Sequence, residues 1–300
     1  MGFNVIGIGE VLWDLLPSGP QLGGAPANFA FHASQLGAQA QVITRVGDDA
    51  RGREIMERLD QMGIADGTVQ IDAFLPTGTT DVELEKGGVP KFTINANSAW
   101  DALELTSYGQ EAVQRADAIC FGTLGQRGPI ASASIQGLVA AAPPESLCVF
   151  DVNLRQNFYT RQIIERSLAA ANVVKLNGHE LAVLSKMFGI RGDVSRQIEH
   201  LDRLFDLDVV ALTRGEKGSL LYQSGNWSDR PGGKVAIVDT IGAGDAFTAA
   251  LVMGLLNRFS LPEIHRIAAE LAAFVCSQPG ATPNLPPHLR AAFVPNCASV

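Results

Sequence analysis

Short apolar runs alternate along the chain with stretches in which apolar residues recur at helical spacing. The apolar runs predict β-strands at residues 3–9, 40–47, 117–125, 147–153, 172–177 and 208–215. Residues 25–37 and 50–63 follow the first two runs and predict helices. Such alternation is typical of a mostly parallel sheet with helices on both faces. We therefore expect an α/β protein, a three-layer α/β/α sandwich.

One segment departs from this rhythm. Residues 68–100 alternate between polar and apolar positions, and the runs at 79–85 and 90–96 flank a pair of glycines. This pattern predicts a β-hairpin with one polar and one apolar face. Together with part of residues 12–22, the segment is interpreted as an insertion that forms a small β-sheet lid on a single domain of residues 1–300.

Composition and charge narrow the function classes. The 300 residues are 46% hydrophobic and 18% charged, as in an ordinary soluble globular protein. The formal net charge of −8 argues against a nucleic-acid partner, which would need a basic patch for phosphates. No apolar run reaches the ~18 residues that cross a bilayer. The four cysteines are scattered, so we expect reduced thiols and a cytoplasmic protein with no membrane partner.

The strongest chemical signal is "DTIGAGD", which links an apolar, strand-like run at residues 236–239 to an apolar helix. Gly242 and Gly244 allow a sharp turn, and the amides of Gly242, Ala243 and Gly244 would form an anion site at the helix N-terminus. Asp245 then falls in the first turn. An acid that only stabilises the helix dipole, by about 0.3–1 kcal/mol, would not explain the glycines. The motif therefore predicts a phosphoryl-transfer centre with a base beside an anion hole.

"DTIGAGDAF" resembles the C-terminal signature of the ribokinase-like (PfkB) carbohydrate kinases, and "GGAPANFAFHASQLGA" at residues 23–38 resembles their N-terminal signature in the form typical of fructokinases. The resemblance covers essentially the whole chain, with the motifs in the right order. It implies a ribokinase-like fold and transfer of the γ-phosphoryl of ATP to a sugar hydroxyl, with Mg²⁺ as cofactor. The best-fitting reaction converts D-fructose to fructose 6-phosphate.

The resemblance also assigns roles around the predicted centre. Asp245 would accept the proton of the sugar hydroxyl, while the amides of Gly242, Ala243 and Gly244 hold the transferring phosphoryl group. The helix dipole is expected to lower the pKa of Asp245 and make it a weak base. In a loose, metaphosphate-like transition state little proton transfer is needed early, so the position of the carboxylate matters more than its basicity.

Five residues are candidates for binding the sugar. Asp14 lies just past the first predicted strand, where the family has its sugar-binding aspartate, and Gly24 and Asn28 match the sugar contacts of the N-terminal signature. Arg155, in "DVNLRQNF", would reach a substrate or a phosphate, or pair with a carboxylate. Gln126 stands near the place where ribokinase has a glutamate, which argues against ribose and for the fructokinase branch. Asp14 as a surface acid and Asn28 as a helix cap remain the simpler alternatives.

Two further motifs match the nucleotide side of the family. In "KLNGHEL", Asn177 would face the phosphates and Glu180 would organise Mg²⁺ through water, because Mg²⁺ dehydrates reluctantly. The alternative for Glu180 is an ordinary acid at a helix start. In "LTRGEKGSLLY", Thr213, Gly215 and Gly218 would line the nucleotide, or they simply form a turn between two strands.

The loop "SQPGA" at residues 277–281 also matches a family segment near the nucleotide and a monovalent-cation site. If that site is present, K⁺ would be held by the carbonyls of Asp239, Ile241, Ser277 and Gly280, with the side chain of Asp239 as a further candidate. Because exposed strand edges tend to pair, a homodimer through the lid is a hypothesis.

Other functions stay open at this point. The acceptor could be 2-keto-3-deoxygluconate, ribose or a nucleoside, because the shared motifs do not separate these kinases. A non-catalytic sugar or nucleotide sensor on the same scaffold is a further alternative, although it would not need the acid and its glycines together. The run "GIGEVL" lacks the third glycine of a dinucleotide fingerprint, so a dehydrogenase has little support.

Overall fold

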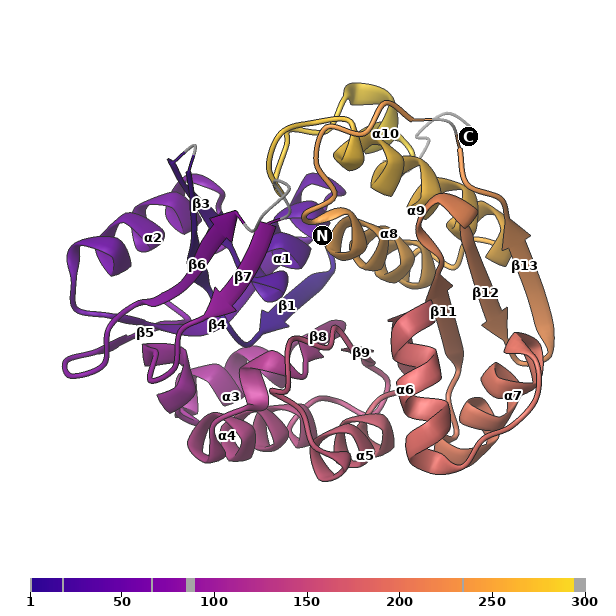
Figure 1. Ribbon diagram of the computed structural model, residues 1–300, viewed down its shortest axis with the longest axis horizontal. Helices are drawn as coiled ribbons and strands as arrows, with labels where there is room; N and C mark the ends of the chain where they lie inside the picture. The colour runs from indigo at the N-terminus through magenta and orange to yellow at the C-terminus, as the bar shows by residue number, and fades with distance from the viewer. Residues whose placement is uncertain (1, 18, 66, 85–89, 234, 294–300) are drawn as a thin grey trace.

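The computed structural model describes residues 2–17, 19–65, 67–84, 90–233 and 235–293 (Figure 1). Within these residues, nine strands form one sheet in the order β13-β12-β11-β10-β9-β8-β1-β4-β5. The strands from β11 to β5 in this order are mutually parallel, whereas β12 is antiparallel to β11 and β13 is antiparallel to β12. Their bounds are β1 (Asn4–Ile8), β4 (Gln39–Gly47), β5 (Val69–Asp72), β8 (Ala118–Gly122), β9 (Leu147–Asp151), β10 (Val173–Asn177), β11 (Val209–Thr213), β12 (Ser219–Gln223) and β13 (Asn226–Arg230).

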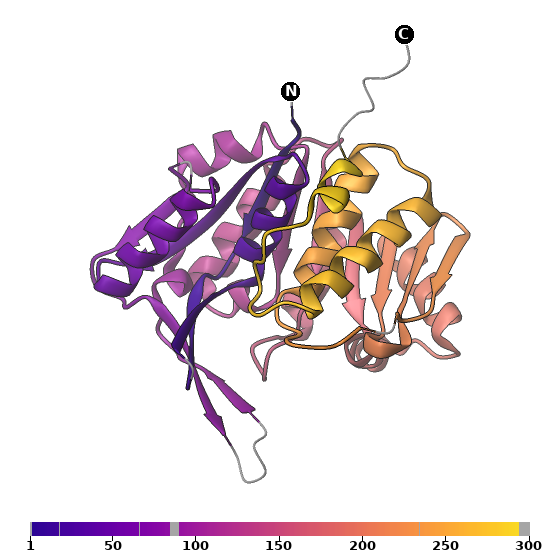
Figure 2. The same cartoon turned by 90° about the horizontal axis from the view of Figure 1, so that it is seen from above.

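Helices cover both faces of this sheet (Figures 1 and 2). One core lies under α1 (Ala25–Gln35), α2 (Ala50–Gln61), α8 (Ala243–Leu256), α9 (Leu261–Cys276) and α10 (Pro287–Ala291). The other lies under α3 (Ser107–Val113), α4 (Pro129–Ala140), α5 (Arg161–Ala170), α6 (Gly178–Phe188) and α7 (Val194–Phe205).

Alternate residues of each strand serve the two cores, as the pleat requires: Val5 of β1 packs in the first core, and its neighbour Ile6 packs in the second. The predicted three-layer α/β/α sandwich is confirmed. Short 3₁₀ helices lie in three of the described loops: η1 (Ala99–Ala102), η2 (Leu124–Gln126) and η3 (Gly215–Lys217).

A second sheet of four strands projects from one end of the body (Figure 2). Its order is β3-β2-β6-β7, where β2 and β6 run parallel and the outer pairs are antiparallel. The predicted hairpin is therefore present as β6 and β7, although its glycine pair lies outside the described residues. The bounds are β2 (Leu12–Leu16), β3 (Gly19–Gly23), β6 (Gly78–Leu84) and β7 (Pro90–Ile94).

Two segments differ from their prediction. β5, expected in the small sheet, pairs with β4 at the edge of the main sheet. An edge strand of either sheet has one polar side, so alternation alone does not say which sheet it joins. Residues 236–239 form no strand: Ile237 and Val238 are 65% and 62% exposed, and the amide of Val238 donates to the carbonyl of Cys276 at the end of α9, at 2.9 Å.

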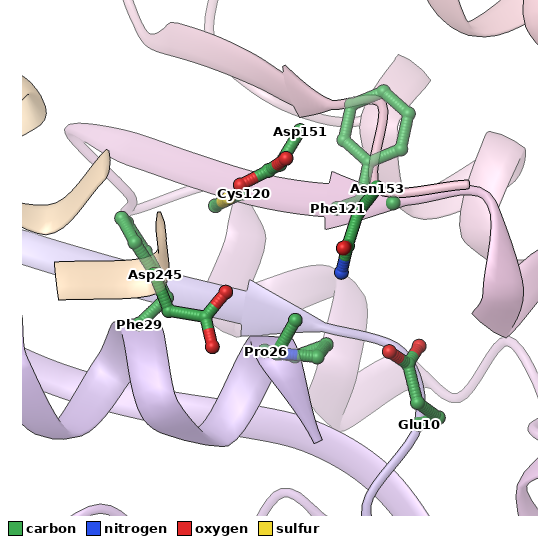
Figure 3. A pocket seen from close by; sticks show the side chains of 10 residues that line it. Glu10, Pro26, Phe29, Cys120, Phe121, Asp151, Asn153 and Asp245 are labelled. Carbon is green, nitrogen blue, oxygen red and sulfur yellow. The ribbon is translucent and has the colours of Figure 1, made fainter. Parts of the chain in front are cut away.

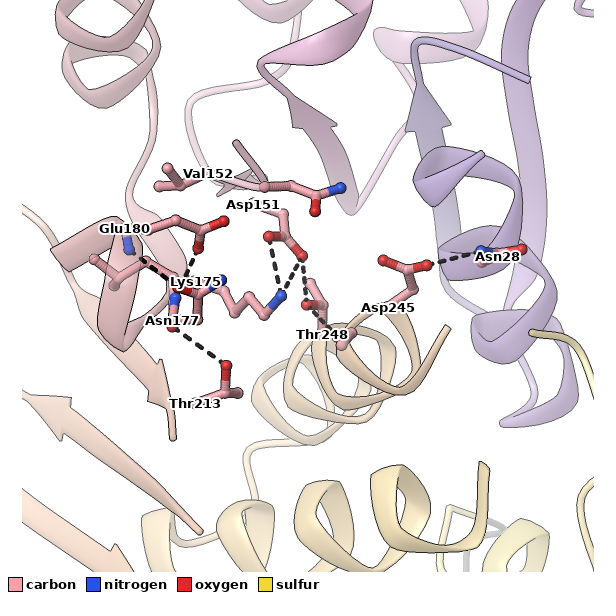
Figure 4. Close-up of polar contacts among 12 residues, drawn as sticks. Asn28, Asp151, Val152, Lys175, Asn177, Glu180, Thr213, Asp245 and Thr248 are labelled. Carbon is pink, nitrogen blue, oxygen red and sulfur yellow. Dashed lines mark hydrogen bonds and ion pairs between the residues drawn. The ribbon is translucent and has the colours of Figure 1, made fainter. Parts of the chain in front are cut away.

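The carboxyl ends of the parallel strands meet at one edge of the main sheet. After β1 the chain passes to β4 on one side, while β8 lies on the other side, so the order of connection reverses between β1 and β8. Open α/β sheets bind ligands at such a point. The N-terminus of α8 lies at this edge (Figure 4), which is where the site is assembled. Among the described residues no helix is both long and apolar enough to span a membrane.

Candidate active site

Gly242 shapes the start of α8. Its φ of 77° lies in the left-handed region, and a Cβ built on it would come within 2.5 Å of the Ala281 carbonyl oxygen. Only glycine fits both conditions without strain. The helix then begins at Ala243, and its first-turn amides have no partner within the helix, which makes this end attractive to an anion. From Ala246 to Gly254 the helix is buried, so this end is held rigidly.

Asp245 joins this helix end to the helix of the N-terminal signature. Asn28 on α1 donates through Nδ2 to Asp245 Oδ2 at 2.8 Å (Figure 4). Asp245 keeps some exposure, whereas Asn28 is only 4% exposed. Two residues that were assigned to the phosphoryl and sugar sides are thus in direct contact. Asn28 does not act as a cap, since the N-cap of α1 is Gly24.

The pKa of Asp245 is raised to about 6. Loss of hydration is the main cause, and the negative charge of Asp151 adds to it, while Lys175, Asn28 and Arg155 act in the opposite direction. The expectation that the helix dipole lowers this pKa is therefore wrong, because desolvation outweighs the dipole. A carboxylate with a pKa near 6 is mostly ionised at neutral pH and accepts a proton better than an ordinary aspartate does.

A pocket opens beside Asp245 between the start of α1 and the ends of β1, β8 and β9 (Figure 3). Apolar side chains form its walls, and carboxylates and an amide face into it. Such a mixture suits a small polar ligand that needs to be oriented. The lining residues are Glu10, Ala25, Pro26, Phe29, Cys120, Phe121, Gly122, Asp151, Asn153 and Asp245.

Glu10 is a pocket residue that the sequence analysis did not select. It follows β1, is 4% exposed, and its Oε2 has no hydrogen-bond partner among the described residues. Burial is the main cause that raises its pKa to about 7. An acid directly after an apolar strand was the available signal, since the ends of central strands are where this fold places its ligands.

Two of the sugar-side candidates, Asp14 and Gly24, lie on the small sheet and at the start of α1. Asp14 is on β2 of the small sheet, and its carboxylate lies against Gly23 of β3, where a Cβ would come within 2.5 Å of Asp14 Oδ2. Burial raises the pKa of Asp14. Gly24 has a φ of 119°, and a Cβ there would lie 2.5 Å from the carbonyl oxygen of Glu10. Its role is to let the start of α1 approach the end of β1.

Arg155 is exposed beyond β9, and its positive charge opposes part of the rise that burial causes in the pKa values of Glu10, Asp14 and Asp245. The charge of the guanidinium therefore acts on carboxylates of both the sugar side and the phosphoryl side. Arg155 Nη1 donates to the carbonyl of Leu154 at 3.2 Å. This arrangement is compatible with a substrate or phosphate contact.

Gln126 does not reach the pocket. Its Nε2 donates to the Gly122 carbonyl at 2.8 Å and to Ser167 Oγ at 2.9 Å, and its Oε1 accepts from Gln136 Nε2 at 2.7 Å. The side chain is 1% exposed and points into the core beneath α4 and α5. Its amide is used to satisfy buried polar groups, so the structure does not bring it together with the other sugar candidates.

Asn177 and Glu180 form a reciprocal cap at the start of α6. Asn177 Oδ1 accepts from the Glu180 amide at 3.0 Å, and Glu180 Oε2 accepts from the Asn177 amide at 2.7 Å. Glu180 Oε1 also accepts from the amide of Leu154 at 2.9 Å. This is the geometry of an acid at a helix start. Each oxygen holds a backbone amide and the side chain is only 2% exposed, so we expect Mg²⁺, which keeps several waters, to reach Glu180 through water.

The glycine turn between β11 and β12 is a hairpin turn, as the simpler alternative proposed. Gly215 and Gly218 have φ values of 59° and 89°, and a Cβ on Gly218 would meet the Arg230 carbonyl oxygen at 2.0 Å. Thr213 lies opposite Asn177 in the register of β10 and β11. The turn therefore stands at the same edge of the sheet as the rest of the site.

The candidate ligands for a monovalent cation come from two loops that are tied together. Asp239 Oδ1 accepts from the Ile241 amide at 3.0 Å, and Oδ2 accepts from the Gly280 amide at 3.3 Å. Ser277 ends α9 at the start of the second loop, with its hydroxyl bonded to the Phe274 carbonyl at 2.7 Å. In the described part of the chain, no group of three or more His, Cys, Asp or Glu residues could hold a metal ion.

A buried ion pair lies next to the N-terminus of α8. Lys175 Nζ donates to both oxygens of Asp151, at 3.1 and 3.0 Å, and Thr248 Oγ1 donates to Asp151 Oδ2 at 3.1 Å (Figure 4). The two charged side chains are 8% and 6% exposed. The sequence analysis missed this pair. The signal was a lysine in the middle of a buried apolar strand, where a charge needs a partner.

Comparison with known proteins agrees with these features. The family model described as pfkB family carbohydrate kinase matches residues 20–288. A fructokinase of Klebsiella pneumoniae is 31% identical over 276 residues, which cover 88% of this chain and 88% of that protein.

Solved structures agree as well. An uncharacterized sugar kinase of Pyrococcus horikoshii in complex with ATP has a TM-score of 0.83 at 26% identity, covering 97% of this chain and 100% of that one. A 2-dehydro-3-deoxygluconokinase of Thermotoga maritima has the same fold, with a TM-score of 0.83 at 19% identity and coverage of 98% of both chains. With the family match and the identity extending over most of its length, the chain belongs to the pfkB family of carbohydrate kinases.

Proposed function

We propose that the chain transfers the γ-phosphoryl group of ATP to a hydroxyl of a small sugar, with D-fructose as the substrate and fructose 6-phosphate as the product. The observation that carries this proposal is the hydrogen bond between Asn28 and Asp245. It puts one carboxylate of raised pKa both at an anion-binding helix end and beside the helix of the sugar-side signature. The similarity to the Klebsiella pneumoniae fructokinase supports the choice of fructose.

In the proposed reaction the sugar oxygen forms a bond to the γ-phosphorus while the bond from that phosphorus to the leaving ADP oxygen breaks. The hydroxyl proton passes to Asp245, which Asn28 holds in place. The amides at the start of α8 stabilise the charge on the transferring group, because they are fixed before the substrate arrives. The rigid, buried remainder of α8 keeps these groups in position.

Mg²⁺ fits this site only when it binds together with the phosphates of the nucleotide. Glu180 is buried and its oxygens hold backbone amides, so it would act through water, and the phosphates and water would supply most ligands. When bound, Mg²⁺ would neutralise charge on the phosphates. Asn177, Thr213, Gly215 and Gly218 stay our candidates for contacts to ATP.

K⁺ is proposed for the loops that contain Asp239, Ile241, Ser277 and Gly280. The carboxylate of Asp239 joins the two loops by its bonds to the Ile241 and Gly280 amides, which supports a shared site there. A cation at this place would order the turn that leads into Gly242. We expect activity in K⁺ to exceed activity in choline at equal ionic strength, and equal rates would contradict the proposal.

Another acceptor is the main alternative, because a 2-dehydro-3-deoxygluconokinase shares the fold. Arg155 supports it, since an exposed guanidinium near the sugar side would suit an acidic sugar.

We also propose a cytoplasmic protein that dimerises through the edge of the small sheet, at β3 or β7. Light scattering that gives only monomer mass at micromolar concentration would contradict the dimer.

The test is release of ADP from MgATP across a panel of sugars that includes fructose, ribose and 2-keto-3-deoxygluconate. We expect turnover with fructose and a loss of about 10²–10⁴-fold in Asp245→Asn. Asp193→Asn is the matched control, because Asp193 is an exposed acid that caps α7 and does not line the pocket. Turnover with a different sugar would move the substrate. No turnover with any acceptor, while a sugar or nucleotide still binds, would favour the sensor.

A further inference from the structure

We propose that Lys175 is a positioning residue of the phosphoryl site: Asp151 holds its ammonium group behind the first turn of α8, where the positive charge of Nζ offsets the negative charge that collects on the transferring group. The inference rests on the proposed kinase function. It goes beyond the signature residues, because neither Lys175 nor Asp151 belongs to the two signature segments.

The register of two strands places the pair. Lys175 on β10 lies directly opposite Asp151 on β9. Side chains that are opposite in neighbouring strands point to the same face of the sheet. That face is covered by α8, whose Thr248 donates to Asp151 at 3.1 Å. The pair therefore connects the central sheet to the helix that carries Asp245, three residues before Thr248.

Gly244 brings the ammonium close to the anion site. A Cβ built on Gly244 would lie 2.9 Å from Lys175 Nζ, so no side chain at position 244 separates Nζ from the first turn of α8. A glycine at position 244 is therefore favoured for a second reason, besides the flexibility that the turn needs. Its absent side chain leaves room for the lysine head group.

The placement runs against the usual preference of helices. Helix N-termini carry partial positive charge and are stabilised by acids, not by lysines. A cation at this end adds to the positive potential instead of balancing it. Stability alone does not explain the pair either, because buried ion pairs are often no more stable than apolar residues of the same size. Both sources of positive charge become favourable when a phosphoryl group occupies the site.

The charged and titratable groups around Asp245 define what the pair does. They are Glu10, Cys120, Asp151, Arg155 and Lys175. Burial alone would lower the pKa of Lys175, but the negative charges of Asp151, Glu180 and Asp245 outweigh it and raise this pKa, so the lysine stays charged. Asp151 acts more strongly on Asp245 than Lys175 does, and as a unit the pair raises the pKa of Asp245.

The test replaces the whole pair by neutral residues of similar size, in the double variant Asp151→Asn/Lys175→Met. Removing Lys175 alone would leave an uncompensated buried charge and destabilise the fold. The matched control is Arg266→Met/Glu270→Gln, which neutralises an exposed ion pair on α9. Thermal unfolding and the affinity for ADP establish that each variant is folded and binds nucleotide.

We expect the site variant to keep its ADP affinity within about threefold and to lose about 10²-fold in kcat at the pH optimum. Its affinity for ADP with aluminium fluoride, which mimics the transferring group, should fall in parallel. The acid limb of the kcat profile should move to lower pH, because the pKa of Asp245 falls when the pair is removed. The control should match the wild type in all three measurements.

A kcat within about twofold of the wild type would overturn the inference, as would a lower kcat with an unmoved acid limb, which would indicate only a displaced α8. Failure of the proposed function is recognised separately. In that case the wild type itself would release no ADP with any sugar of the panel, before any variant is compared.

Discussion

At the scale of single residues, the site is governed by how little water reaches its carboxylates. Asp245 and Glu10 both have raised pKa values, about 6 and about 7, and burial is the first cause for each. Hydrogen bonds and cations oppose this shift at Asp245 through Asn28, Lys175 and Arg155. The same residues therefore set both the chemistry and the pH range in which the chemistry operates.

The rate should depend on the ionisation of Asp245. A base with a pKa of about 6 is protonated below that pH, so we expect kcat/KM to rise through pH 6 and to level off above about pH 7. Asn28→Ala removes a hydrogen bond that favours the ionised form, so its acid limb should move to higher pH. Asn257→Ala, at the other end of α8, is the control and should leave the limb in place. An unshifted limb in Asn28→Ala would contradict the assignment.

Glu10 should reduce stability as the pH rises. Its pKa is higher in the folded state than the ordinary 4.5, so between those values the folded protein binds more protons than the unfolded chain, and stability falls with increasing pH. Glu10→Gln should therefore stabilise the protein at pH 8, by about 3 kcal/mol at most, and have little effect at pH 4. Urea unfolding at both pH values measures this, with exposed Glu145→Gln as control. Equal effects at both pH values would contradict it.

At the scale of elements, the start of α8 depends on one backbone conformation. Gly242→Ala has to place a Cβ at a φ of 77° and within 2.5 Å of the Ala281 carbonyl. We expect a loss of about 1–3 kcal/mol in stability and a large loss of kcat, because the proposed anion site at the start of α8 would move. Gly189→Ala, at a φ of 71° with open space around it, should cost only about 1 kcal/mol and keep kcat. Equal losses of kcat in the two variants would show that strain alone is responsible.

The elements were also the level that the sequence predicted best. The glycine motif, the apolar helix after it and the alternating strands all follow from local patterns, and the structure has them. Side-chain contacts that depend on the register of paired strands could not be predicted from the sequence. Lys175 and Asp151 are 24 positions apart and meet only because β9 and β10 pair as they do. Gln126 follows β8 closely in the sequence, which suggested a place in the pocket. Its side chain instead points toward polar partners on α4 and α5, which the sequence did not reveal.

At the scale of the whole molecule, the small sheet and the main body meet around the sugar side of the site. Asp14 comes from the small sheet, and Asn28 and Asp245 come from the body. We expect fructose with a non-hydrolysable ATP analogue to slow amide hydrogen exchange in β2 and β6. β13, at the far edge of the main sheet, should be unaffected. Slower exchange in β13 but not in β2 would contradict a lid role for the small sheet.

The contact between Asn28 and Asp245 spans 217 positions of the chain. During synthesis, α1 therefore leaves the ribosome long before α8, and the sheet face on which both helices pack stays partly uncovered until about residue 256. A premature stop codon upstream of Asp245 would give a fragment without the proposed proton acceptor and with a bare apolar face, a feature that favours aggregation. For this protein, a shortened gene product should be an aggregating fragment and not a weaker enzyme.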